Sequence, residues 1–116
     1  MILVDTSVWI NHFREYNSQL ANLLEQGQVM CHSLIIGELA CGYLHNRHKI
    51  LNLLSALPSA GESTDALHFI ERNKLMGRGV GIVDVLLLAS ASLSEVSFWT
   101  MDKRLHNIAI ELKLAA

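Results

Sequence analysis

Four carboxylates interrupt the most apolar stretches of the chain. Asp5 follows the opening apolar run, Glu38 and Asp84 lie inside two later runs, and Asp102 stands just after a fourth. A carboxylate in apolar surroundings costs free energy unless it is paired or binds a metal. Little cationic charge lies near these four residues in the sequence. We therefore expect them to form a shared acidic pocket that holds a divalent cation.

The chemistry of such a pocket follows from its ligands. Mg²⁺ and Mn²⁺ prefer hard oxygen ligands in octahedral geometry. Without a cation, close carboxylates repel each other, and at least one of them is expected to take up a proton. A bound cation would hold a phosphate oxygen, orient a water and lower the pKa of that water. Hydrolysis of a phosphodiester is the reaction that this site would serve best, and it needs no His or Lys as a base.

Each carboxylate also has a structural explanation. Asp5 and Asp102 could cap the helices that follow them, and Asp84 could interact with a helix dipole. A structural role is weakest for Glu38, because its neighbours at helical spacing carry no charge; they are Leu34, Ile35, Cys41 and Gly42. For each carboxylate considered alone, the structural explanation and the functional explanation are about equally supported. Four structural explanations at the ends of buried elements are together improbable.

Length and composition limit the class of protein. A chain of 116 residues with 51% hydrophobic residues predicts one globular domain, residues 1–116, with a real core. Asp84 breaks the longest apolar run, so no membrane span is expected, and the N-terminus does not resemble a signal peptide. We expect a cytoplasmic protein with reduced cysteines. The net charge of −2 gives no strongly basic nucleic-acid footprint.

The hydrophobic pattern alternates between short apolar runs and helical periodicity. It predicts strands at 1–5, 28–31 and 96–100, and helices at 6–14, 18–26, 34–45, 46–57, 64–76, 83–93 and 103–112. Strands separated by helices indicate an α/β fold with a parallel sheet covered on both faces. Ligands bind beyond the carboxyl ends of such strands. Asp5 and Asp102 would therefore reach the same rim if their strands are neighbours.

Four segments together resemble a PIN domain, and most closely the VapC-type toxins of prokaryotic toxin–antitoxin pairs. They are Val4–Ile10, Ile36–Leu39, Gly81–Ala89 and Trp99–Leu105, and they occur in the expected order along essentially the whole chain. The resemblance implies a three-layer α/β/α domain around a central parallel sheet. It also implies an endoribonuclease that cleaves RNA with Mg²⁺, or with Mn²⁺ as a substitute.

The resemblance further implies a role for each site residue. Asp5 and Asp84 would bind the metal directly, and Glu38 and Asp102 would complete the acidic quartet directly or through water. The supporting hydroxyls would be those of Thr6, Ser7 and Thr100. The implied partners are a second copy of the chain, in a homodimer, and a cognate antitoxin whose C-terminal segment lies over the pocket. DNA would be bound only indirectly, through the antitoxin. Residues 114–116 are short for a final strand, so that strand is expected to be missing or truncated.

Basic residues near the acidic segments could contact the RNA backbone or form a solubilising surface. The candidates are Arg78, Lys103 and Arg104, with Arg72 and Lys74 further away in the sequence.

Two other functions stay open at this point. One is a phosphatase or phosphotransfer domain that uses an aspartate on the first strand, although Ser7 stands where a second aspartate would be expected. The other is a catalytically silent PIN-like interaction module.

Overall fold

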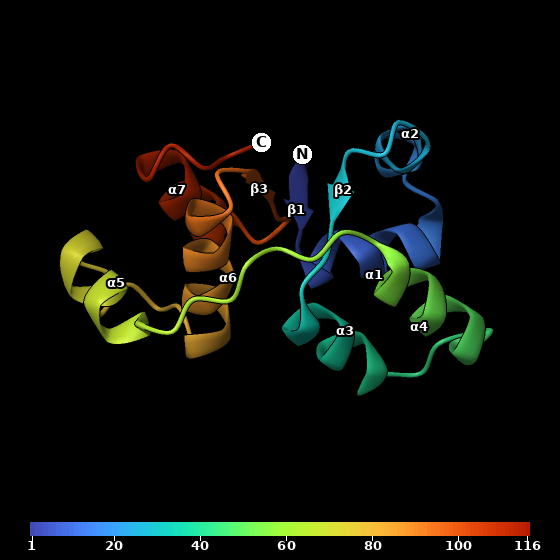
Figure 1. The fold of residues 1–116 in the computed structure, drawn as a ribbon, viewed down its shortest axis with the longest axis horizontal. Coiled ribbons are helices and arrows are strands. Elements are labelled where there is room, and N and C mark those ends of the chain that lie inside the picture. The colour runs from blue at the N-terminus through green and yellow to red at the C-terminus, as the bar shows by residue number, and fades with distance from the viewer.

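Three short strands alternate with seven helices (Figure 1). The computed structural model describes all 116 residues. Its elements are β1 Ile2–Val4, α1 Thr6–Glu15, α2 Ser18–Glu25, β2 Val29–Met30, α3 Ser33–Ala40, α4 Arg47–Ala56, α5 Ala66–Asn73, α6 Ile82–Leu93, β3 Ser97–Trp99 and α7 Lys103–Glu111. No helix is long and apolar enough to cross a membrane.

The strands form a parallel sheet in the order β2-β1-β3. Leu3 of β1 lies opposite Met30 on one side and Phe98 on the other. Single parallel bridges extend the sheet at both edges, between Cys31 and Ser59 and between Phe98 and Ala115. The parallel α/β class predicted from the sequence is thus confirmed. The expected final strand is truncated to one bridge at the C-terminus.

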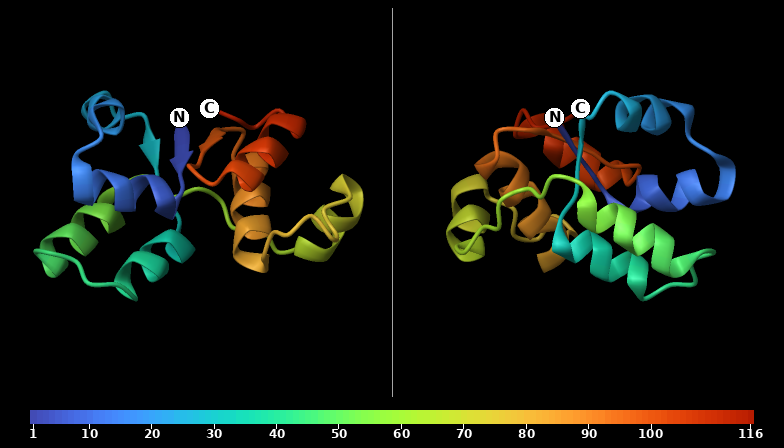
Figure 2. Two further views of the ribbon diagram at one scale, coloured as in Figure 1. Left: turned by 180° about the vertical axis from the view of Figure 1, so that it is seen from behind. Right: turned by 45° about the vertical axis from the view of Figure 1, so that its right-hand side comes forward.

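Helices cover the sheet from both sides. In Figures 1 and 2, α1 to α4 lie to one side of the strands, and α5 to α7 lie to the other. The core includes the contact of α6 with the sheet, where Leu87 and Leu88 of α6 are fully buried together with Leu3 and Phe98. Burial of such side chains contributes about 1.5–3 kcal/mol each. This packing fixes α6, and with it Asp84, against the central strands.

Two helices are shorter than their periodicity predicts. The predicted helix over 34–45 ends at Ala40, because the Arg47 guanidinium donates to the carbonyls of Ala40 (2.6 Å) and Gly42 (3.1 Å). These bonds satisfy carbonyls that a longer helix would have used itself. The predicted helix over 64–76 begins only at Ala66, where the Asp65 side chain accepts a hydrogen bond from the His68 N–H (3.0 Å). It ends at Asn73, because the next residue, Lys74, has a left-handed conformation.

The parallel arrangement places all carboxyl ends of the strands at one edge of the sheet. Both chain termini lie at the opposite edge, close together in Figure 1. The residues that follow β1 and β3 therefore meet at the same rim, as the sequence predicted for Asp5 and Asp102.

Candidate active site

Asp5 is the buried centre of the candidate site. It directly follows β1, the residue is only 7% exposed, and its N–H donates to the carbonyl of Trp99 at the end of β3 (2.8 Å). Although Asp5 stands at the N-cap position of α1, its side chain makes no capping hydrogen bond. The structural explanation of Asp5 as a helix cap therefore fails.

Two hydroxyls orient the Asp5 carboxylate. Thr100 Oγ1 (2.7 Å) and Ser7 Oγ (2.9 Å) both donate to Asp5 Oδ2, and the Met101 N–H donates in turn to Ser7 Oγ (3.0 Å). Asp5 Oδ1 accepts no hydrogen bond from the protein. The chain thus holds one carboxylate oxygen in place and leaves the other available for a ligand.

Glu38 reaches the site from α3. The Thr6 hydroxyl at the start of α1 donates to Glu38 Oε1 (2.7 Å), which joins the two helices beside Asp5. Glu38 is exposed to solvent. No Lys or Arg forms an ion pair with it, so a neutral hydroxyl is its only side-chain partner.

Asp102 approaches from the end of β3. Its N–H donates to Thr100 Oγ1 (3.1 Å), and its Oδ1 accepts from the Leu105 N–H (3.0 Å), so it caps α7. The structural explanation of Asp102 as a cap is therefore correct for one of its oxygens. The same Thr100 hydroxyl links Asp102 to Asp5, which connects the two strand ends through one side chain.

Asp84 completes the group from the first turn of α6. Burial is the main cause that raises the pKa of its carboxyl, and hydrogen bonding to the Gly81 backbone opposes this. The negative charges of Asp5, Asp102 and Glu38 raise the pKa further. Asp84 therefore lies within electrostatic reach of each of the other three carboxylates. The only ion pair of the structure, between Arg78 and Glu111, involves none of them.

The site is more open than the sequence suggested. Asp5 is buried and Asp84 half-buried, but Glu38 and Asp102 are exposed. The expectation that all four lie at buried element ends is therefore wrong for these two.

The donor set fits a hydrated cation. No group of three or more His, Cys, Asp or Glu side chains is placed so that it could hold one metal ion directly. Mg²⁺ commonly keeps several waters and uses only one or two carboxylates. Asp5, with its free oxygen, and Asp84, surrounded by uncompensated negative charge, match this requirement. Glu38 and Asp102 are close enough to contribute charge without forming a direct cage.

The predicted RNA-binding residues have different environments. Arg78 forms an ion pair with Glu111 (3.0 Å), and Arg104 Nη1 donates to the Gly79 carbonyl (3.2 Å). Both contacts tie the loop before α6 to α7. Gly79 has a φ of +78°, a conformation that favours glycine, and the absence of a Cβ leaves room for the Arg104 guanidinium beside it. Lys103 is exposed and has no such partner.

Replacing Thr100 by Val is expected to lower the free energy of unfolding by about 1–3 kcal/mol. The substitution leaves the buried Asp5 carboxylate with one hydroxyl donor and removes the acceptor of the Asp102 N–H. Urea unfolding followed by circular dichroism measures the effect. Thr100→Ser keeps the hydroxyl and should retain most of the stability. Equal stability of the Val variant and the unmodified protein would contradict the role of this hydroxyl.

The sequence matches the PIN domain family over residues 2–111. The chain belongs to this family, which agrees with its parallel sheet and with the carboxylates at the rim of that sheet. Ribonuclease VapC32 of Mycobacterium tuberculosis is 42% identical to it over 118 residues, which cover 99% of this chain and 95% of the relative. The same values hold for the proteins of strains CDC 1551 / Oshkosh and ATCC 25618 / H37Rv.

Proposed function

We propose that this protein is a divalent-metal-dependent endoribonuclease and the toxin of a type II toxin–antitoxin pair. The observation that carries the proposal is the convergence of Asp5, Glu38, Asp84 and Asp102 at one edge of the sheet without a cationic partner. The family and the relatives named as ribonucleases support RNA as the substrate.

Each residue of the site has a role in this proposal. Asp5 and Asp84 bind Mg²⁺, or Mn²⁺ in its place, and Glu38 and Asp102 contribute directly or through water. When bound, the cation supplies positive charge for the scissile phosphate and lowers the pKa of the attacking water. The Ser7 and Thr100 hydroxyls keep Asp5 Oδ1 directed at the ligand, and Thr6 holds Glu38 in the same way.

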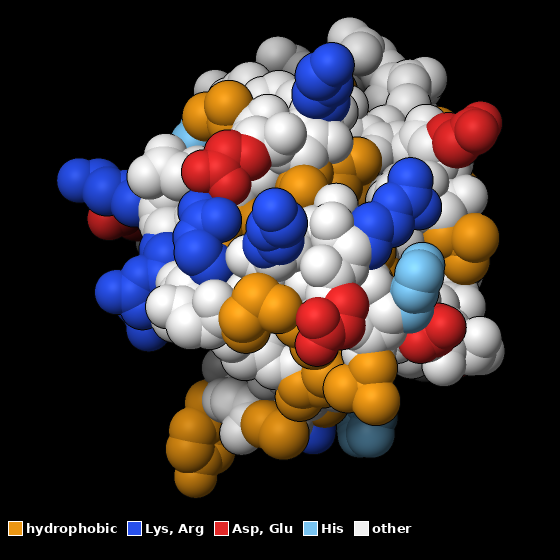
Figure 3. Space-filling view, turned by 90° about the vertical axis from the view of Figure 1, so that its left-hand side faces the viewer, with side chains coloured by type: hydrophobic (Ala, Val, Ile, Leu, Met, Phe, Trp, Pro, Cys, Tyr) orange, Lys and Arg blue, Asp and Glu red, His pale blue; other side chains and the backbone are white.

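The basic residues contribute to RNA binding to different degrees. Figure 3 shows Lys and Arg side chains gathered on the side of the molecule where α5 and α7 lie. Lys103 is free to contact a phosphate. Arg78 and Arg104 already make intramolecular contacts, so only the part of their charge that remains accessible can interact with RNA. Lys103 is therefore the main phosphate contact among the three.

The proposed partners follow from the toxin assignment. They are an RNA substrate, a cognate antitoxin that covers the acidic site, and a second copy of the chain in a homodimer. DNA is reached only through the antitoxin, and the protein acts in the cytoplasm.

Removal of divalent metal is expected to abolish cleavage of RNA by the purified protein. A chelator such as EDTA should reduce cleavage to the background, and added Mg²⁺ or Mn²⁺ should restore it, because the uncompensated carboxylates need a cation before they can approach a phosphate. Gel analysis of a labelled structured RNA measures this. Cleavage that continues unchanged in the chelator would refute a metal-dependent nuclease.

A further inference from the structure

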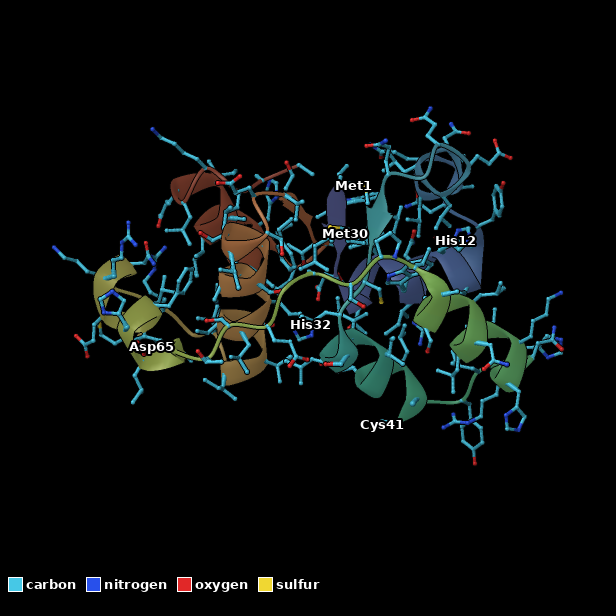
Figure 4. All side chains as sticks on the ribbon, in the orientation of Figure 1. Met1, His12, Met30, His32, Cys41 and Asp65 are labelled. Carbon is cyan, nitrogen blue, oxygen red and sulfur yellow. The ribbon has the colours of Figure 1, made fainter.

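A histidine closes the first turn of α3. His32 directly precedes this helix, and its Nδ1 accepts a hydrogen bond from the Leu34 N–H (3.0 Å). Figure 4 labels His32 where the chain enters α3. An N–H can donate only to a ring nitrogen that carries no proton, so the ring must be neutral, with its own proton on Nε2. The helix therefore begins with a cap that exists in one protonation state only.

The backbone beside the ring is fixed by the sheet. His32 is only 4% exposed. The residue before it, Cys31, bonds to the segment that leads from α4 to α5: its N–H donates to the Pro58 carbonyl (2.8 Å), and its carbonyl accepts from the Ala60 N–H (2.9 Å). The ring is thus attached between the sheet on one side and α3 on the other, and a rotation that exposed it to water would remove the cap.

A cavity of about 180 Å³ gives protons access to the ring. It is lined by His32, Ser33, Leu34, Glu62, Ser63 and Leu86. His32 Nε2 has no hydrogen-bond partner in the protein, but it is not sealed from solvent, because Trp9 Nε1 is the only buried side-chain nitrogen or oxygen without a partner. The ring can therefore exchange its proton while the protein stays folded.

The surroundings of His32 favour the neutral ring. Burial is the main cause that lowers the pKa of the ring below its ordinary value of 6.5. The Glu62 carboxylate opposes this effect, and it is held nearby by the Ser33 hydroxyl, which donates to its Oε1 (2.8 Å). Glu62 is the only charged residue in the lining of the cavity, since Leu86 of α6 is apolar, and burial raises the pKa of the adjacent Cys31 thiol. The positive end of the α3 dipole also disfavours a charged ring.

We propose that His32 is a proton-controlled cap: the neutral ring closes the first turn of α3, and protonation in weakly acidic solution opens it. A charged imidazole donates from both nitrogens, so the Leu34 N–H loses its acceptor and faces a positive charge. Because α3 has only eight residues, one lost cap affects a large part of it. Opening would also weaken the attachment of α3 to α1, which the hydrogen bond between Glu38 and Thr6 provides. The inference goes beyond the proposed function, because it concerns how α3 is held.

The pH dependence has a defined sign. The folded protein binds the His32 proton more weakly than the unfolded chain does, because the pKa of the ring is lowered on folding. The stability that the neutral cap supplies is therefore complete above the unfolded pKa of 6.5, and it is lost as the pH falls toward the folded pKa.

Urea unfolding of the full-length protein in EDTA, from about pH 7.5 down to about pH 4.5, tests this linkage. The unmodified protein should lose more stability over this range than His32→Asn, because Asn caps a helix without titrating. His45→Asn replaces an exposed loop histidine and should follow the unmodified protein. His32→Ala should raise the equilibrium constant for unfolding about 2- to 30-fold at neutral pH, as the loss of a helix cap does.

NMR of the unmodified protein tests the cap directly and needs no variant. At neutral pH the His32 ring should carry its proton on Nε2, and the Leu34 amide should exchange slowly with solvent. On acidification this amide should lose its protection as the ring becomes charged, while the rest of the fold persists.

Three results would overturn the inference. They are a proton on Nδ1 at neutral pH, a Leu34 amide that stays protected beside a charged ring, and an equal loss of stability in His32→Asn and the unmodified protein. A protein that unfolds as a whole before the ring titrates would also contradict it. These measurements use neither RNA nor metal, so a failure here is distinct from a failure of the proposed nuclease function.

Discussion

Asp5→Asn is expected to reduce RNA cleavage by about a thousandfold or more while the fold stays intact. The substitution removes the charge that binds the cation, and the several kcal/mol of charge stabilisation that the cation supplies are lost with it. The fold should tolerate the change because an amide oxygen can still accept the hydrogen bonds of Ser7 and Thr100. Cleavage of labelled RNA in Mg²⁺ and circular dichroism of the same preparation measure the two effects.

The control for Asp5→Asn is Glu25→Gln, which neutralises an exposed carboxylate at the end of α2, away from the strand ends. It should cleave RNA as the unmodified protein does. Parallel purification of both variants also detects a contaminating nuclease, since a contaminant would be present in each. Full activity in a pure Asp5→Asn preparation would show that the acidic site is not the catalytic centre.

Asp84→Asn is expected to stabilise the metal-free protein and to abolish its stabilisation by Mg²⁺. Burial and the charges of Asp5, Asp102 and Glu38 raise the pKa of Asp84 above its ordinary value of 3.8, so its ionised form is unfavourable in the folded state. An amide has no charge to repel, and the unfolding temperature of the metal-free protein should rise by roughly 2–5 °C at neutral pH. The unmodified protein should gain stability from Mg²⁺, whereas the Asn variant should not.

The effect of Asp84→Asn should depend on pH in a defined direction. The folded protein holds the Asp84 proton more tightly than the unfolded chain does, because its pKa is raised on folding. The penalty is therefore absent below the unfolded pKa, grows as the pH rises through the folded pKa, and is complete at neutral pH. Thermal unfolding with EDTA at about pH 3.5 and at pH 7 measures the difference. The Asn variant is expected to lack activity at both pH values. A larger stabilisation at the acidic pH would contradict this electrostatic account.

The candidate site was predictable from the sequence to the extent that it depends on strand ends. A carboxylate directly after a buried apolar run must lie near the end of a strand, and parallel strands bring such ends to one edge. This reasoning placed Asp5 and Asp102 together, and the structure confirms that β1 and β3 are neighbours. The hydroxyls of Ser7 and Thr100 also lie within three residues of these strand ends, and they meet at Asp5 Oδ2.

The environments of the basic residues were not predictable in the same way. Arg78 and Glu111 are far apart in the sequence, as are Arg104 and Gly79, and their contacts arise only when α7 packs near the loop before α6. The early end of α3 likewise involves a long-range contact, because the Arg47 guanidinium of α4 donates to the carbonyls of Ala40 and Gly42.

The sequence alone determined the α/β class, the order of the elements and the identity of the acidic residues. Hydrophobic periodicity and apolar runs are patterns among residues that are close together in the sequence. Only the tertiary structure decided how exposed each carboxylate is, which of its oxygens is free, and which cations are already engaged. These properties depend on contacts between side chains that are far apart in the sequence, and no local sequence pattern encodes such contacts.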